Sequence, residues 1–94
     1  MTKAKLYTKT GELCAPNGIK LLTFSSVRNM ETKAKGLQNG YYSFKVKQEK
    51  NKWYYQVRAK NGTTIASSNP YSTKKSVLRG IRRVKNYVTD LNLV

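Results

Sequence analysis

The chain has 94 residues and a strong excess of positive charge, with 19 Lys and Arg against 4 Asp and Glu and a net charge of +15. That length allows one domain, or two very small ones. The chain has no His and one cysteine, Cys14, which excludes a His-dependent triad, an intrachain disulfide and a Cys-rich zinc site. The few carboxylates are scattered along the sequence, so we expect no enzyme activity, no metal site and no cofactor.

Apolar runs are short throughout the chain. None approaches the ~20 residues of a membrane span, and no apolar segment typical of a signal peptide follows the first residues, so we expect a cytoplasmic protein without membrane contact. The small size and the Lys- and Asn-rich composition are typical of a phage or low-GC bacterial protein.

The first forty residues predict short strands followed by a helix. In chain order the expected elements are a hairpin at 6–16, a turn at 17–18, a strand at 19–24 and a helix at 30–39. Gly11 and Gly18 favour the turns. Asn39-Gly40 is typical of a helix stop in the left-handed conformation.

Residues 41–67 predict a three-stranded antiparallel meander. Apolar and polar side chains alternate over 41–47 and again over 52–58, which is typical of strands with one buried face. The polar residues between them predict a hairpin loop of about four residues. Asn61-Gly62 favours a type I′ turn, in which both central positions need a positive φ, before a third strand at 63–67.

An amphipathic helix is expected after Asn69-Pro70, because proline has no backbone donor for a strand ladder. Ser72 or Thr73 can cap this helix. Its apolar positions cluster on one side and include Val77, Ile81, Val84 and Val88. Gly80 within the helix indicates a close backbone approach, Lys74 and Lys85 flank the apolar side, and the tail at 88–94 predicts a final strand.

The two halves of the chain carry a faint internal repeat. Residues 9–15 resemble 60–66, and 35–37 resemble 79–81 at a different offset. A degraded first copy of a hairpin–helix unit explains both similarities, and chance is the alternative because Lys-polar-Gly turns are common in a Lys-rich chain. We therefore expect an α+β fold in one small domain, 1–94, with an antiparallel sheet packed against the amphipathic helix; 1–40 would be a degenerate first unit and 41–94 a complete β-β-β-α-β unit.

Several motifs in the second half resemble one known family. Residues 59–68 read Ala-Lys-Asn-Gly-Thr-Thr-Ile-Ala-Ser-Ser, and Tyr71-Ser72, Gly80-Ile81 and 84–86 (Val-Lys-Asn) follow. With these motifs the chain resembles the YegP-like family, well over 41–87 and weakly over 6–39.

The resemblance implies architecture rather than activity. Its units have three strands, a helix and a further strand, and two units share one sheet and swap their last strands. The resemblance implies that 88–94 would pair with a strand outside its own unit. The partner unit would be the other half of the same chain, in a monomer with a tandem repeat, or a second chain, in a homodimer formed by strand exchange. The family supplies no catalytic residues, and this chain departs from it in being far more basic.

The outward face of the predicted sheet is one candidate binding surface. If Phe44, Tyr55 and Val57 face the helix, the alternating side chains face solvent: Tyr41, Lys45, Lys47, Lys52, Tyr54 and Arg58. Lysines and tyrosines on an open sheet can bind single-stranded nucleic acid through phosphate contacts and base stacking. The alternative is that they serve solubility and β-propensity, as on many antiparallel sheets.

The basic side of the predicted helix is the second candidate surface. It is formed by Lys75, Arg79, Arg82 and Arg83. Guanidinium groups fit phosphates bidentately, whereas the alternative is an ordinary solvated helix face. No carboxylate occurs from 57 to 89, and this absence favours binding because ordinary exposed helices intersperse Glu.

Cys14 and Trp53 are expected to have structural rather than functional roles. With no His to activate it, Cys14 is expected to be a small buried hydrophobe. Trp53 follows the apolar alternation and is expected in the core.

Together these features predict a non-enzymatic protein that binds nucleic acid through the phosphate backbone with little sequence specificity, with DNA slightly favoured over RNA. The alternative is a protein-interaction module, an inhibitor or adaptor that docks an acidic protein, since the same positive field attracts both kinds of partner.

Overall fold

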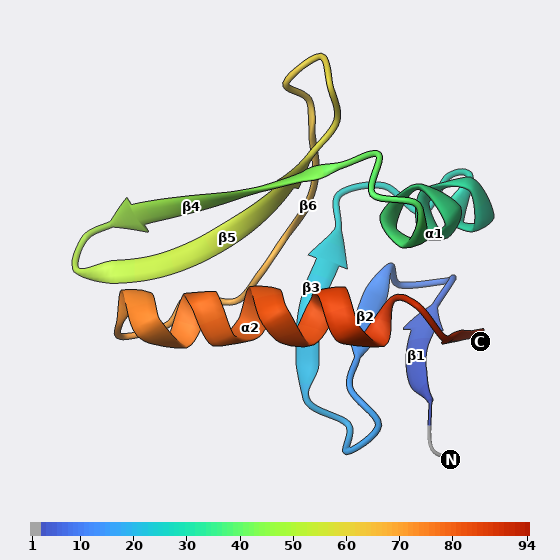
Figure 1. The fold of residues 1–94 in the computed structure, drawn as a ribbon, viewed down its shortest axis with the longest axis horizontal. Coiled ribbons are helices and arrows are strands. Elements are labelled where there is room, and N and C mark those ends of the chain that lie inside the picture. The colour runs from blue at the N-terminus through green and yellow to red at the C-terminus, as the bar shows by residue number, and fades with distance from the viewer. Residues whose placement is uncertain (1–2) are drawn as a thin grey trace.

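One mixed sheet of seven strands, in the order β4-β5-β6-β3-β2-β1-β7, carries two helices in the computed structural model, which describes residues 3–94 (Figure 1). The strands are β1 (Ala4–Tyr7), β2 (Glu12–Cys14), β3 (Lys20–Phe24), β4 (Ser43–Glu49), β5 (Lys52–Arg58), β6 (Thr64–Ser67) and β7 (Leu91–Leu93). The helices are α1 (Met30–Gln38) and α2 (Lys74–Tyr87). Neighbouring strands are antiparallel except β1 and β7, which are parallel, and the expected α+β class is confirmed.

The sheet is continuous because β3 of the first half pairs with β6 of the second. Thr23 lies opposite Ser67 in this central pair. Each half contributes three antiparallel strands and then a helix, and the last strand crosses over: β7 pairs with β1, in the half to which it does not belong. The pairing of the tail outside its own unit, which the family resemblance implied, is confirmed.

The internal repeat has a different register from the one expected. Leu13 pairs with Leu22 as Val57 pairs with Ala66, so equivalent positions differ by 44 in residue number. The similarity of 35–37 to 79–81 has this offset. The match of 9–15 with 60–66 was wrong in register, since it aligned the β1–β2 turn with the β5–β6 turn.

The β4–β5 hairpin is tighter than the expected loop of about four residues. The strands continue to Glu49 and from Lys52, which leaves Lys50 and Asn51 as a two-residue connection. Both have positive φ, 48° and 66°, as a type I′ turn requires. The prediction was wrong because neither residue is glycine, so the turn signal was weak.

The β5–β6 turn is not the expected type I′ turn. Gly62 has φ +88°, but Asn61 is not among the residues with positive φ. The Asn61 side-chain oxygen accepts from the Thr63 N–H at 3.0 Å, and the Gly62 N–H donates to the Ala59 carbonyl at 3.0 Å. The loop is thus a turn closed by a single left-handed glycine, and the β2–β3 loop repeats it at Gly18.

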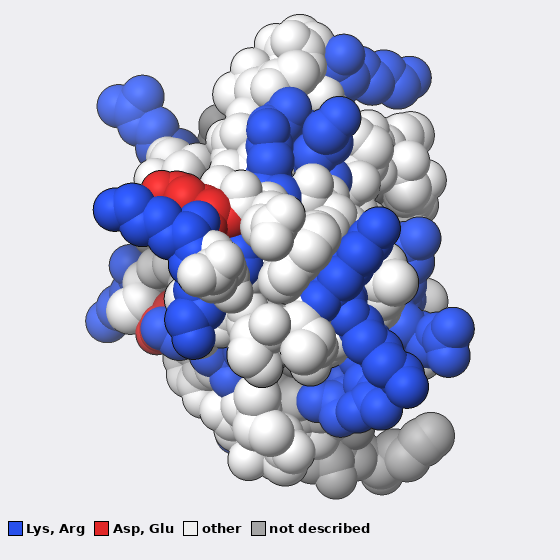
Figure 2. All heavy atoms as spheres, turned by 90° about the vertical axis from the view of Figure 1, so that its left-hand side faces the viewer, with Lys and Arg blue, Asp and Glu red and all other residues white. Residues whose placement is uncertain are grey.

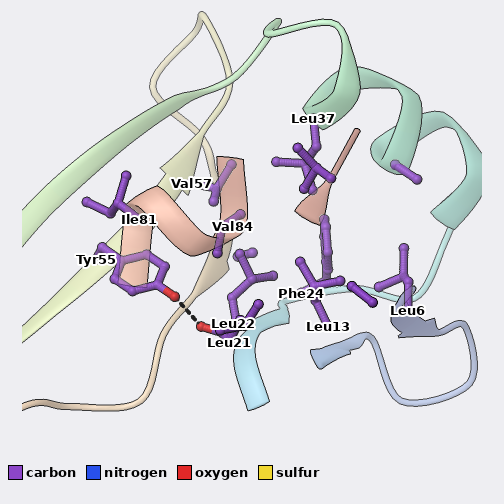
Figure 3. Close-up of a cluster of buried hydrophobic side chains, with 14 of the residues drawn as sticks. Leu6, Leu13, Leu21, Leu22, Phe24, Leu37, Tyr55, Val57, Ile81 and Val84 are labelled. Atoms are coloured by element: carbon purple, nitrogen blue, oxygen red, sulfur yellow. Dashed lines mark hydrogen bonds between the residues drawn. The ribbon is translucent and has the colours of Figure 1, made fainter. Parts of the chain in front are cut away.

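The core lies between one face of the sheet and the two helices. Tyr55 and Val57 of β5 are fully buried beneath Ile81 and Val84 of α2 (Figure 3). The buried residues of α1, including Leu37, join the same cluster. The alternation of buried and open positions along β4 and β5 is therefore as predicted.

Helix α2 is anchored at its start and near its middle. Thr73 is the N-cap, and its side chain accepts from the Ser76 N–H at 3.2 Å. At Gly80 a Cβ atom would lie 2.8 Å from the Tyr55 ring, so the predicted close approach is confirmed. The helix passes across the sheet from the β4–β5 hairpin towards β1 (Figure 1).

Two burial predictions need correction. Cys14 is half-buried rather than buried, because along β2 it alternates with the fully buried Leu13 and so falls on the other face of the strand. Partial burial raises the pKa of its thiol. Trp53 is also half-buried, because it packs at the edge of the core rather than inside it.

Candidate nucleic-acid interface

The predicted site residues fall into two groups on opposite faces of the sheet. The first group points away from the helices: Lys45, Lys47, Lys52, Tyr54 and Arg58. Within it, Lys47 lies directly opposite Tyr54 on the neighbouring strand. The second group is on α2, on the other side of the sheet layer, so one flat ligand cannot contact both groups fully. Tyr41 precedes β4 and is 60% exposed.

The basic stripe of α2 consists of Lys75, Arg79 and Arg82, all exposed and pointing away from the sheet. With Leu78, which is 51% exposed, they line a shallow hollow of about 270 Å³. Arg83 lies further round the helix, towards β3. The structure therefore keeps the predicted stripe but turns one member of it to the side.

Lys74 and Lys85 contact aromatic rings rather than joining the stripe. The Lys74 Nζ lies 5.9 Å from the centre of the Trp53 ring, and the Lys85 Nζ lies 5.5 Å from that of Phe44. Each lysine stem thus covers a half-buried aromatic residue while its charge stays at the surface. Their place at the apolar boundary of the helix is as the sequence predicted.

Few of the cations are neutralised within the chain. Across 3–94 the ion pairs are Lys3–Asp90 at 3.1 Å and Lys20–Glu12 at 2.9 Å. The Lys20 ammonium holds the pKa of Glu12 below its usual value. Figure 2 shows the end of the molecule with the β4–β5 hairpin and the start of α2, where Lys and Arg crowd around a pale strip with little acidic surface. Such a surface attracts polyanions.

A hollow of about 320 Å³ on the open face includes residues that sequence reasoning missed. Lys52 and Tyr54 line it together with Glu49, Lys50 and Pro70. Pro70 reaches this place because its neighbour Tyr71 exchanges two backbone hydrogen bonds with Trp53, at 2.8 and 2.6 Å. The short hairpin turn brings Lys50 there. The local sequence pattern gives no indication that Pro70 or Lys50 lies beside Lys52 and Tyr54.

Comparison with known proteins shows which family model and which solved structures this chain resembles. Residues 49–94, which hold β5, β6, α2 and β7, match the family model described as a domain of unknown function, DUF1508. The resemblance to the YegP-like family is confirmed. The protein of unknown function yegP from E. coli has a similar solution structure, with a TM-score of 0.75 and 25% identity over 98% of this chain and 90% of that one.

A second YegP-like structure shows the same fold. The UPF0339 protein SO3888 from Shewanella oneidensis matches with a TM-score of 0.71 and 20% identity over 99% of this chain and 92% of its own. The search of curated proteins found no match. The region that matches the DUF1508 model contains the whole of α2, and so the whole basic stripe.

A hollow of about 450 Å³ lies between the C-terminal ends of the two helices and the start of β4. Lys85 is the charged side chain in its lining. Within residues 3–94 no group of three potential metal ligands is present. No helix of the described region has the length and apolar character needed to cross a membrane.

Proposed function

We propose that this YegP-like protein is a non-enzymatic nucleic-acid-binding protein that contacts the phosphate backbone with little sequence specificity, prefers DNA to RNA and acts in the cytoplasm. The observation that carries the proposal is the surface of α2. The helix has no acidic residue, and none of its cations takes part in an ion pair within the described chain. An exposed helix of this kind lacks the interspersed carboxylates that ordinarily offset its charge.

The dimensions of α2 suit duplex DNA. Its 14 residues extend over about 21 Å, and Lys75, Arg79 and Arg82 follow one another along the outward side. The major groove of B-DNA is about 12 Å wide and admits a helix, whereas the major groove of A-form RNA is too narrow. This difference in groove width supports the preference for DNA.

Low sequence specificity follows from the side chains available. Lys and Arg on an exposed helix reach phosphate oxygens, and phosphate contacts position a protein without reading the base sequence. Lys45, Lys47 and Arg58 are further cations on the open face of the sheet, which points away from α2. A protein charged on both faces can coat or bridge nucleic acid.

The test is a salt titration of binding. Fluorescence anisotropy with a labelled duplex DNA of about 20 base pairs, between roughly 50 and 200 mM KCl, should give a log K against log[salt] slope of about −4 to −5, as for five neutralised phosphates. A duplex RNA of the same sequence should bind more weakly. A slope near zero contradicts the proposal, and equal affinity for poly-glutamate would favour an acidic protein as the partner.

A further inference from the structure

A small hollow lies where α2 passes the start of β3, to one side of the outward stripe. Its volume is about 170 Å³. Its lining includes Ile19, Leu21, Tyr71, Ser76, Arg79 and Arg83. The lining contains two arginines and two hydroxyl-bearing residues, Ser76 and Tyr71, and no carboxylate.

The helical spacing brings these groups to one side of α2. Ser76, Arg79 and Arg83 fall within about 60° around the helix axis. The two arginines are one turn apart, an arrangement that is unfavourable for like charges. Neither of them forms an ion pair in the part of the chain that the structure describes. An anion between them would remove the repulsion.

A hydroxyl donor is available beside the arginines. The Thr73 Oγ1 accepts from the Ser76 N–H and lies 3.0 Å from the Ser76 Oγ. When Thr73 donates to Ser76 across this contact, the Ser76 hydroxyl proton is free for a ligand in the hollow. The contact between the two hydroxyl groups thus fixes the position of the Ser76 side chain, which also lines the hollow.

The floor of the hollow is rigid. The ring of Tyr71 stacks on Tyr55, with ring centres 6.2 Å apart and planes inclined by 14°. The Tyr55 hydroxyl in turn donates to the Leu21 carbonyl, and both Tyr55 and Leu21 are buried. Ile19, which is 50% exposed, adds an apolar wall at the rim. A fixed floor keeps the donors in place before a ligand arrives.

We propose that this hollow binds a phosphomonoester dianion, and that the group it takes is the phosphorylated end of a polynucleotide; the inference rests on the proposed nucleic-acid binding and gives it a preferred site. A terminal phosphate carries about two charges and matches the two guanidinium groups, whereas a phosphodiester carries one. The concave shape admits the end of a polynucleotide strand. The next phosphates of that strand would then contact the exposed stripe beside the hollow.

The test compares two single-stranded DNA oligonucleotides of about 12 residues, labelled at the 3′ end, that differ only in a 5′-phosphate or a 5′-hydroxyl group. The phosphorylated oligonucleotide should bind about fivefold to tenfold more tightly in anisotropy titrations. S76A and R83Q should each remove most of this preference. R82Q deletes the same charge on the outward side of α2 and should weaken both oligonucleotides equally, with the preference intact.

Equal affinity for the two oligonucleotides would overturn the inference while leaving the proposed function standing. Loss of the preference in R82Q as well as R83Q would also overturn it. If neither oligonucleotide binds, the proposed function fails. The phosphate site is then tested separately, by titration with a nucleoside 5′-monophosphate and measurement of amide chemical shifts in an NMR spectrum. Shifts confined to the surroundings of Ser76 and Arg83 would make a free nucleotide the source of the phosphate, and no shift would refute the site.

Discussion

The hydroxyl of Tyr55 donates a hydrogen bond to the carbonyl of Leu21, joining β5 to β3 across the intervening strand β6 (Figure 3). Leu21 belongs to the first half of the chain and Tyr55 to the second. The phenol ring has no exposed surface, and Gly80 of α2 lies against it. This single side chain therefore ties together the two repeats and the helix that carries the basic stripe.

Replacing Tyr55 by Phe should destabilise the fold without changing its shape. The substitution leaves the Leu21 carbonyl without its phenol donor in a buried place, so we expect the free energy of unfolding to fall by about 1–2 kcal/mol. Urea unfolding followed by circular dichroism measures this. Y54F, on the open face of the same strand, is the matched control and should change stability by less than about 0.5 kcal/mol. Equal effects of the two substitutions would refute the role assigned to the buried bond.

The same residue predicts how stability depends on alkaline pH. Burial raises the pKa of Tyr55 well above the usual value of 10. Above pH 10 the unfolded chain releases this proton and the folded chain keeps it, so the free energy of unfolding should fall by up to about 1.4 kcal/mol per pH unit from this group alone. Below pH 10 the contribution is constant.

Unfolding measured at several pH values between about 9 and 11.5 tests this dependence. Y55F lacks the titrating group and should show a shallower fall in stability, and the lysines, which titrate in both proteins, cancel in the comparison. Parallel curves for the two proteins would mean that the phenol of Tyr55 ionises in the folded state.

The two helical glycines should respond differently to alanine. A Cβ atom would lie 2.8 Å from the Tyr55 ring at Gly80 and 2.7 Å from the Tyr42 ring at Gly36. Tyr55 is buried and hydrogen-bonded and cannot move aside, so G80A should cost about 1–3 kcal/mol despite the better helix propensity of alanine. Tyr42 is half-buried and can swing outwards, so G36A should cost less. Thermal unfolding of the two variants measures which loses more stability. A larger loss of stability in G36A than in G80A would contradict the prediction.

The periodic parts of this fold could be predicted from the sequence because burial alone fixes them. Alternation along β4 and β5 correctly assigned Tyr55 and Val57 to the core side. The spacing of Val77, Ile81 and Val84 correctly assigned the apolar side of α2, and with it the exposed stripe opposite.

Features that depend on long-range pairing could not be predicted from local patterns. The pairing of Thr23 with Ser67 joins residues far apart in sequence, and it makes the two halves into one sheet. The hollow lined by Arg79 and Arg83 depends on this arrangement, since Ile19 and Tyr71 reach α2 from different halves of the chain. The tail's pairing with β1 came from the family resemblance rather than from the alternation of Leu91 and Leu93.

The last prediction decides which face of the molecule carries binding. K75Q/R82Q removes two charges from the outward side of α2, and K45Q/K47Q removes two from the open face of the sheet. If α2 is the main surface, the first variant should lower the magnitude of the salt slope by about 2 and weaken duplex DNA binding about tenfold at low salt. The second variant has the same net charge and controls for long-range attraction, so it should bind DNA nearly as the unchanged protein does. A greater loss in K45Q/K47Q would move the interface to the sheet, where lysines beside Tyr54 favour single strands.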